Sequence, residues 1–117
     1  MAELAVENDE LVLHLSGAEK AESLHRDLRV PLSAVTSIQV IEDAHGAADH
    51  PGLKAGTRLP GVVEVASIRT ADGKIFAAVH RATPRGVRVL LHEGSYDEWI
   101  VGCPDPEAVV AALKLPT

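Results

Sequence analysis

Two aspartates and two histidines lie close together in this 117-residue chain, at Asp43, His45, Asp49 and His50. Imidazole and carboxylate groups are ligands that Zn²⁺ and Ni²⁺ accept in proteins. The stretch around them has no hydrophobic period that would fix a ligand geometry. We therefore interpret it as a solvated polar loop, with a metal site as the alternative, and expect no metal and no other cofactor.

Cys103 is the only cysteine, so the chain can form neither an internal disulfide nor a multi-cysteine zinc site. No base or cation adjoins it in the sequence, and we interpret it as a structural residue, with a catalytic pairing to a distant histidine as the alternative. His92-Glu93 begins like a zinc-protease motif but runs into Gly94-Ser95, a turn. No other familiar catalytic signature is present, so we expect that the protein is not an enzyme.

The segment 52–61 has the residue types of a binding loop. Its glycines free the backbone, Lys54 and Arg58 are cations, and Leu53 and Leu59 are apolar. That mixture suits an anionic or peptide partner; alternatively, the segment crosses the end of the fold with both leucines turned inward. The candidate partner-binding residues are Leu53, Lys54, Arg58, Leu59 and the nearby His50.

The charge of the chain limits its partners. Seventeen acidic residues outnumber 11 basic ones, which gives a net charge of −6. We therefore expect no nucleic-acid partner and no attachment to anionic lipid by charge alone. No apolar run reaches the roughly 20 residues that span a bilayer, so we expect no integral membrane segment. An acidic N-terminus argues against a secretion signal, and we expect a cytoplasmic protein.

Local patterns predict the elements of the first part of the chain. Alternating or β-branched apolar residues predict strands at 4–6, 11–15 and 38–41. Ser16 and Glu19 have the spacing of a capping box, which predicts a helix over about 17–27. Residues 43–60 show no period, and we interpret them as a long loop, either functional or mobile.

The second part of the chain is typical of hairpins followed by a helix. Strands are predicted at 62–70, 74–80, 87–91 and 96–101. Asp72-Gly73 is a strong hairpin signal between the first two. Asp105 as N-cap and Pro106 at the first helical position predict a helix over 106–114. The apolar face of this helix is expected to contain Val109, Ala112 and Leu113.

Residues 1–117 are expected to form a single domain, because the length suits one domain and 46% of the residues are hydrophobic. Mostly antiparallel pairing favours a sandwich or a partly open barrel that the last helix closes. Nine apolar positions are expected to be largely buried in one cluster: Leu13, Ile38, Val40, Val63, Val79, Val89, Val101, Val109 and Leu113.

Several segments resemble the bacterial pleckstrin-homology-like domains. The run 29–40, which opens Arg-Val-Pro-Leu-Ser-Ala-Val, resembles the start of a strand in that family, and 99–108 resembles its last strand and closing helix. The helix at 16–28 and Leu59-Pro60-Gly61 are similar to a small uncharacterised branch. The fold that this resemblance implies is mainly β with α: a partly open barrel of two antiparallel sheets, an inserted helix after the first strands, and a C-terminal capping helix.

The resemblance implies little about chemistry, because one fold serves many functions. Relatives that bind phosphoinositides use a basic cluster; Lys20, Arg26 and Arg29 lie in that region, but acidic neighbours dilute their charge. We expect a non-enzymatic interaction domain that binds a protein or peptide, or forms a homodimer, through an exposed sheet edge. The alternative is a small-ligand or lipid-binding barrel, with the 43–60 loop as a lid over an enclosed apolar cavity.

Overall fold

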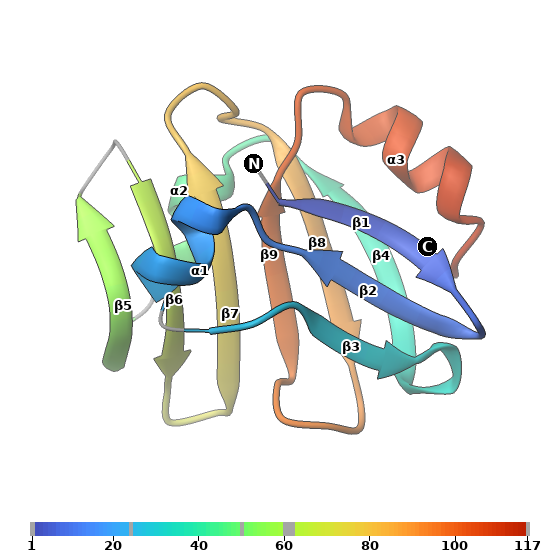
Figure 1. The fold of residues 1–117 in the computed structure, drawn as a ribbon, viewed down its shortest axis with the longest axis horizontal. Helices are drawn as coiled ribbons and strands as arrows, with labels where there is room; N and C mark the ends of the chain where they lie inside the picture. The colour runs from blue at the N-terminus through green and yellow to red at the C-terminus, as the bar shows by residue number, and fades with distance from the viewer. Residues whose placement is uncertain (1, 24, 50, 60–62, 117) are drawn as a thin grey trace.

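The computed structural model describes residues 2–23, 25–49, 51–59 and 63–116, which form two β-sheets and three α-helices (Figure 1). The strands are β1 (Glu3–Glu7), β2 (Glu10–His14), β3 (Leu28–Pro31), β4 (Val35–Ile41), β5 (Leu53–Leu59), β6 (Val63–Arg69), β7 (Lys74–His80), β8 (Gly86–Leu91) and β9 (Glu98–Gly102). The helices are α1 (Gly17–Ser23), α2 (Ala44–Ala48) and α3 (Pro106–Leu113), with a 3₁₀ turn at Leu32–Ala34.

Strands β1, β2 and β3 form a small antiparallel sheet in that order. The β1–β2 hairpin turns at Asn8 and Asp9, whose φ angles are 50° and 63°. Asn and Asp tolerate this left-handed conformation better than most other residues with a side chain. The predicted pairing of residues 4–6 with 11–15 is confirmed.

The other six strands form a mixed sheet in the order β4-β8-β9-β7-β6-β5. The hairpin predicted around Asp72-Gly73 is present as β6 and β7. The β7–β9 pair is parallel, so the expectation of two purely antiparallel sheets is wrong. The parallel pairing follows from the strand order. Strands β8 and β9 form a hairpin, and the second strand of this hairpin, β9, lies beside β7 in place of β8. No local pattern in the sequence decides which strand of a hairpin takes that place.

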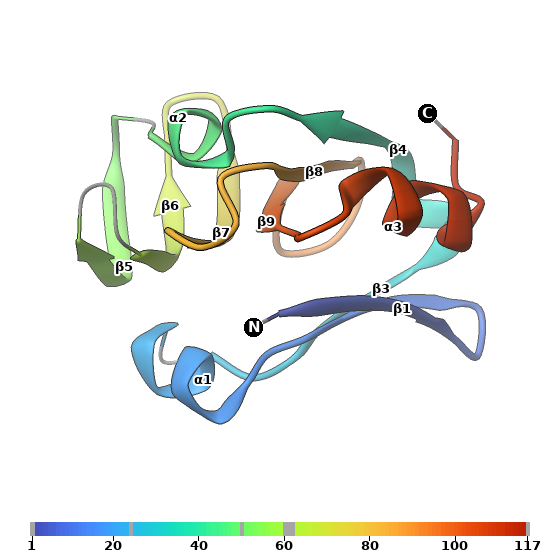
Figure 2. The ribbon, with the colours of Figure 1, turned by 90° about the horizontal axis from the view of Figure 1, so that it is seen from above.

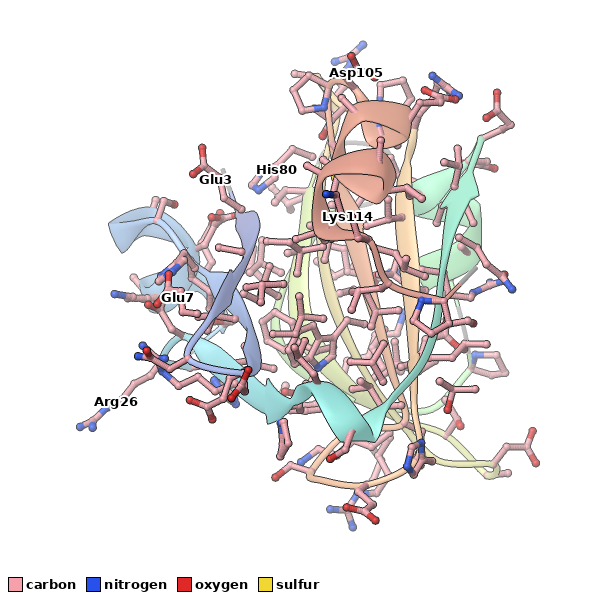
Figure 3. The ribbon with its side chains drawn as sticks, turned by 90° about the vertical axis from the view of Figure 1, so that its right-hand side faces the viewer. Glu3, Glu7, Arg26, His80, Asp105 and Lys114 are labelled. Carbon is pink, nitrogen blue, oxygen red and sulfur yellow. The ribbon has the colours of Figure 1, made fainter. Side chains whose placement is uncertain are left out.

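The small sheet lies against one face of the large sheet (Figure 2), and side chains fill the space between the two layers (Figure 3). Within the described ranges, no strand of one sheet pairs with a strand of the other. The fold is therefore an open two-layer arrangement, and the expected barrel does not form. Helix α1 packs on β5 and β6, whereas α3 packs on β4, β1 and β8, so the two helices lie at opposite ends of the layers.

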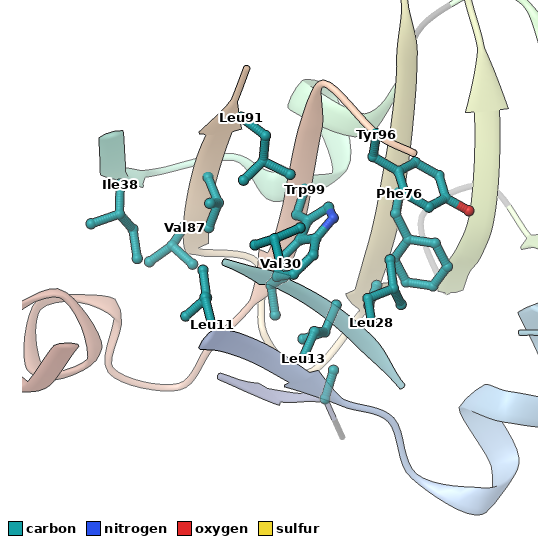
Figure 4. Close-up of a cluster of buried hydrophobic side chains, with 14 of the residues drawn as sticks. Leu11, Leu13, Leu28, Val30, Ile38, Phe76, Val87, Leu91, Tyr96 and Trp99 are labelled. Carbon is teal, nitrogen blue, oxygen red and sulfur yellow. The ribbon is translucent and has the colours of Figure 1, made fainter. Parts of the chain in front are cut away.

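Two hydrophobic clusters lie on the two faces of the large sheet. The larger one lies between the sheets and contains Leu13, Phe76 and Trp99 (Figure 4). The smaller one lies between the opposite face and α2, and contains Ile68 and Ile100. Alternate residues of β7 supply both clusters, which explains why that strand reads as an unbroken apolar run.

The prediction of one cluster is therefore only partly right. Five of its residues are buried in the larger cluster, namely Leu13, Ile38, Val63, Val89 and Val101. Val79 is buried in the cluster beneath α2, whereas Val40, Val109 and Leu113 are half-buried. A strand that is apolar on both faces does not reveal from its sequence which face meets which layer.

Both predicted helix starts are confirmed. Ser16 Oγ accepts a hydrogen bond from Glu19 N at 3.2 Å, and Glu19 Oε1 accepts one from Ser16 N at 2.9 Å. Helix α1 ends at Ser23, earlier than predicted, because the chain must then reach the start of β3. Asp105 Oδ1 accepts from Ala108 N at 3.2 Å and begins α3.

The packing face predicted for the terminal helix is right for Val109 and Leu113 and wrong for Ala112, whose place Val110 takes. Ala112 is exposed, and the half-buried residues of α3 are Val109, Val110 and Leu113. Their partial burial shows that α3 covers the end of the layers without being enclosed by them. No helix in the described part of the chain is long and apolar enough to cross a membrane.

Within the segment 43–60, residues 44–48 form α2 and residues 53–59 form β5, so the interpretation of this segment as a long loop is wrong. Asp43 Oδ1 caps α2 by accepting from Gly46 N at 3.0 Å. Strand β5 has no apolar alternation because it is an edge strand with little burial on either side. Gly56 has a φ of 134°, and a Cβ there would lie 2.4 Å from Val65 O, so this close approach to β6 requires glycine.

Candidate functional site

Strand β5 forms a free edge of the large sheet. It pairs with β6 over seven residues, from Leu53 opposite Arg69 to Leu59 opposite Val63. No backbone hydrogen bond joins its outer side to another residue of the described chain. The edge strand on the opposite side, β4, is partly covered, because Ile38 N donates to Pro116 O at 2.7 Å. Strand β5 is therefore the less protected of the two edges.

Large apolar side chains are exposed along the β5 edge. Leu53 is 78% exposed and Leu59 is 55% exposed, so neither is turned inward. Both lie on the side of β5 that faces α1, as does Thr57, whose Oγ1 donates to the carbonyl oxygen of Glu22 at 2.9 Å. Single exposed leucines need no explanation, but two that flank an unpaired strand edge form a candidate contact surface.

Lys54 and Arg58 lie on the opposite side of β5, where both contact one carboxylate. Glu64 is only 4% exposed, and its Oε1 lies 3.1 Å from Lys54 Nζ and 2.9 Å from Arg58 Nε. Arg58 also lies 2.7 Å from Asp49 Oδ1. A buried carboxylate needs such partners, because its desolvation is costly. The two cations predicted to bind a partner thus fasten β5 to the rest of the fold.

Three of the residues considered as metal ligands, Asp43, His45 and Asp49, line a hollow of about 210 Å³ together with Glu64. Asp43 caps α2, and the Asp49 carboxylate forms an ion pair with Arg58 of β5. His45 Nε2 is buried without a hydrogen-bond partner among the described residues, and His50 lies outside them. Among the residues that the structure describes, no three His, Cys, Asp or Glu side chains are grouped so as to hold a metal ion.

A second hollow of about 380 Å³ adjoins the leucine side of β5, and we call it the basic hollow. One of its walls is the start of β5, at Leu53 to Ala55. The remaining lining residues come from the end of α1, the segment before β3, β6, β7 and the turn before β9; they are Ser23, His25, Ser67, Arg69, Lys74 and Tyr96. No carboxylate is among the residues that line it.

Two uncompensated cations distinguish the basic hollow. Arg69 and Lys74 lie directly opposite each other in the β6–β7 pair. Neither has an ion-pair partner in the described part of the chain. The Lys74 ammonium instead lies 4.8 Å from the centroid of the Tyr96 ring. Like charges directly opposite one another on neighbouring strands repel, and an anion between them would remove that repulsion.

Three rings pack together at the basic hollow: His25 and Tyr96 line it, and Phe76 is fully buried against them. His25, Phe76 and Tyr96 pack against one another with ring centroids 5.4 to 5.9 Å apart. The Tyr96 hydroxyl lies 2.6 Å from Ser67 Oγ, and His25 Nδ1 donates to the carbonyl oxygen of Arg26 at 2.6 Å. These contacts fix a hydroxyl pair and an imidazole beside the two cations.

A buried carboxylate outside this site connects distant segments. Glu19 is 1% exposed, and its Oε2 accepts from Ala2 N at 3.0 Å and from His80 Nε2 at 2.7 Å. Figure 3 shows His80 beside the start of β1, which Glu3 marks. Burial alone would raise the pKa of Glu19, but hydrogen bonds from Ser16 and His80 lower it overall. The sequence revealed only the capping role of Glu19, because His80 lies 61 residues away.

Cys103 is buried, and burial raises the pKa of its thiol to about 11. The reactive thiolate is therefore a minor species at neutral pH, which supports a structural role. Beside Cys103 lies a hollow of about 400 Å³ between the start of β1 and α3, lined also by Leu4 and Val109. Neither α2 nor β5, the two elements of the proposed lid, covers it, because α2 packs on the outer face of the large sheet and β5 forms its far edge.

No family model matches the sequence, and no curated protein or solved structure shows a significant similarity to the chain. The resemblance to pleckstrin-homology-like domains therefore stays a prediction. Structurally, the chain is mainly β, with two sheets that do not close into a barrel.

Proposed function

We propose that this protein is a non-enzymatic interaction domain that binds an extended segment of a protein partner along the free edge of β5. The unpaired outer side of β5, flanked by the exposed Leu53 and Leu59, carries this proposal. A segment that adds to a sheet edge gains main-chain hydrogen bonds and places alternate side chains beside the residues of that edge. Seven residues of β5 offer an edge of about 20 Å for such pairing.

The contacts of β5 support its use as a fixed template. The ion pairs of Lys54 and Arg58 with Glu64 fasten one side of the strand. The hydrogen bond from Thr57 to Glu22 fastens the other side to α1. A strand that is already ordered loses little conformational entropy when a partner binds, so more of the contact energy is available as affinity.

Charge favours a different chain over a second copy of this one. In an antiparallel homodimer centred on Gly56, Leu53 would lie opposite Leu59, which is favourable. Lys54 would then lie opposite Arg58 of the second copy, and directly opposed like charges are destabilising, although Glu64 and Asp49 offset part of this repulsion within each copy. A partner segment with acidic or neutral residues at those positions avoids this repulsion. The homodimer is the alternative that the experiment below must exclude.

Peptide selection tests the proposal. Short random-sequence peptides are selected on the wild-type protein, and binding is then measured with a double variant, Leu53→Ser with Leu59→Ser. We expect the double variant to lose at least about tenfold in affinity, because both apolar contacts are removed. Val6→Ser is the matched control, since Val6 is an exposed apolar residue on β1 (42%) and should bind like wild type. Hydrogen exchange should show peptide-dependent protection of the β5 amides.

Two results would overturn this proposal. One is that no selected peptide distinguishes the double leucine variant from Val6→Ser. The other is that β5 amides are protected without peptide in a wild-type dimer that the leucine substitutions dissociate. The second result would identify another copy of this chain as the occupant of the edge.

A further inference from the structure

We infer that the basic hollow receives an anionic side chain of the segment bound on β5, an inference that rests on the proposed function. The ligand class is an oxyanion carried on a side chain, either a carboxylate or a phosphate. Leu53 and Ala55 belong both to the edge and to the wall of the hollow. A segment paired with β5 therefore runs directly past the opening.

Strand register places the hollow within reach of such a segment. Leu53 lies opposite Arg69 and Ala55 lies opposite Ser67, so these four side chains share one face of the sheet. Neighbouring strands are about 4.8 Å apart, so an added strand would run roughly 10 Å from β6. An arginine on β6 and a long acidic side chain on the added strand together span that distance.

The positive charges at the basic hollow favour an anionic ligand. Arg69 and Lys74 oppose each other without an ion-pair partner in the described residues. The carboxylate of Asp97 accepts from the backbone N of Lys74 at 2.9 Å, not from its ammonium, and does not line the hollow. A bound oxyanion would be attracted to both Arg69 and Lys74 and would offset their mutual repulsion. The Arg69 guanidinium could also hold two oxygens of the anion.

The remaining polar groups suit the same ligand. In the Tyr96–Ser67 pair one hydroxyl donates to the other, which leaves one hydroxyl proton free for an acceptor. The packed rings of His25, Phe76 and Tyr96 hold these donors in place before binding. A volume of about 380 Å³ is large enough for a phosphate group as well as for a carboxylate.

The experiment uses peptides that bind the β5 edge in the selection above. At one position, opposite Leu53 or Ala55, each peptide is made with Glu, Gln or phosphoserine, and affinities are measured for wild type, Arg69→Gln and Lys74→Gln. We expect each variant to bind the Glu and phosphoserine peptides about tenfold more weakly than wild type does, because one charge-assisted contact is lost. The Gln peptide should bind all proteins equally. The tighter of the two acidic peptides identifies the source of the oxyanion.

Arg81→Gln is the matched control. It makes the same change of net charge at an exposed residue just after β7, and Arg81 has no ion-pair partner in the described chain. We expect less than about a twofold effect from it, because no contact with the ligand is lost. Arg69 is exposed as well, so Arg69→Gln is expected to fold, which thermal unfolding checks.

Each contrary outcome has a distinct meaning. Peptides that need Leu53 and Leu59 but bind Arg69→Gln and Lys74→Gln unchanged would overturn this inference and leave the proposed function intact. If no peptide needs the leucines, both fail. Binding to phosphoinositide-containing vesicles that the two substitutions abolish, without binding of acidic peptides, would assign the hollow to a lipid headgroup and would also overturn the inference.

Discussion

His14 connects three segments of the small sheet through its two ring nitrogens. Its Nε2 lies 2.6 Å from Glu7 Oε2 in β1, and its Nδ1 lies 3.1 Å from Asp27 Oδ2 before β3. The hydrogen bond with Glu7, followed by that with Asp27, raises the pKa of His14 above its usual 6.5. Only a protonated imidazole donates from both nitrogens, so the folded protein binds this proton more tightly than the unfolded chain does.

His14→Gln should therefore destabilise the protein more at about pH 6 than at about pH 8.5. Because the folded pKa is raised, the stabilisation is fully present below the unfolded value of about 6.5 and is lost as pH rises through the folded value. Urea unfolding of both proteins across this range measures the difference in free energy of unfolding. The other five histidines are common to both proteins, so their titration cancels. A difference that does not shrink as pH rises would contradict the assignment.

At the residue scale, sequence reasoning succeeded where contacts are local. The capping pairs Ser16–Glu19 and Asp105–Ala108 were predictable, because a spacing of three residues fixes which groups can meet at a helix start. The partners of Glu64 were not predictable in this way. The sequence presents Lys54 as a candidate partner-binding cation, because nothing local shows that β5 pairs with β6 or that a buried carboxylate lies on that side.

At the element scale, strands with apolar alternation were predicted and the two elements within 43–60 were missed. Helix α2 has only five residues, mostly small, so its apolar face is too short to show a helical period. Strand β5 is an edge strand, and its exposed leucines resemble those of a loop. An element with little burial on either side has no hydrophobic pattern for the sequence to display.

The contribution of α3 to stability should be moderate. Leu113 is half-buried, so Leu113→Ala should cost about 1–2 kcal/mol, less than the roughly 2–5 kcal/mol of a fully buried site. Asp105→Ala should cost about 1 kcal/mol through loss of the cap on Ala108 N. Ala112→Ser, at an exposed position of the same helix, should cost no more than about 0.5 kcal/mol. Urea unfolding gives all three free energies. A wild-type midpoint for Leu113→Ala would mean that α3 does not pack on β4.

At the scale of the whole molecule, the features that matter most for function bring together residues far apart in the chain. The basic hollow combines His25, Ser67, Arg69, Lys74 and Tyr96, and sequence reasoning identified none of them as a site. The parallel β7–β9 pair positions Tyr96, in the turn before β9, against Phe76 of β7. The composition predicted an acidic protein, and a net charge of −6 for the whole chain does not reveal a local basic surface.

The Glu19 carboxylate has a comparable role in the interior. It ties the start of β1, the start of α1 and the end of β7 together through Ala2, Ser16 and His80. These segments belong to both layers, so the carboxylate couples the small sheet to the large one. Its pKa is lowered by the hydrogen bonds that it accepts, despite its burial. The ionised form is therefore the one that stabilises the fold.

Glu19→Gln should lower the free energy of unfolding by about 2 kcal/mol at about pH 7, because buried hydrogen bonds to a charged acceptor become bonds to a neutral amide. Because the folded pKa is lowered, this contribution is present above the unfolded value of about 4.5 and is lost as pH falls through the folded value. Glu22→Gln, on the same helix and without an ion pair in the described residues, is the control and should stay within about 0.5 kcal/mol of wild type. Hydrogen exchange should show that α1, β1 and the end of β7 lose protection together in Glu19→Gln. Loss confined to α1 would mean that Glu19 only caps its helix and that the two layers are held together by the apolar core alone.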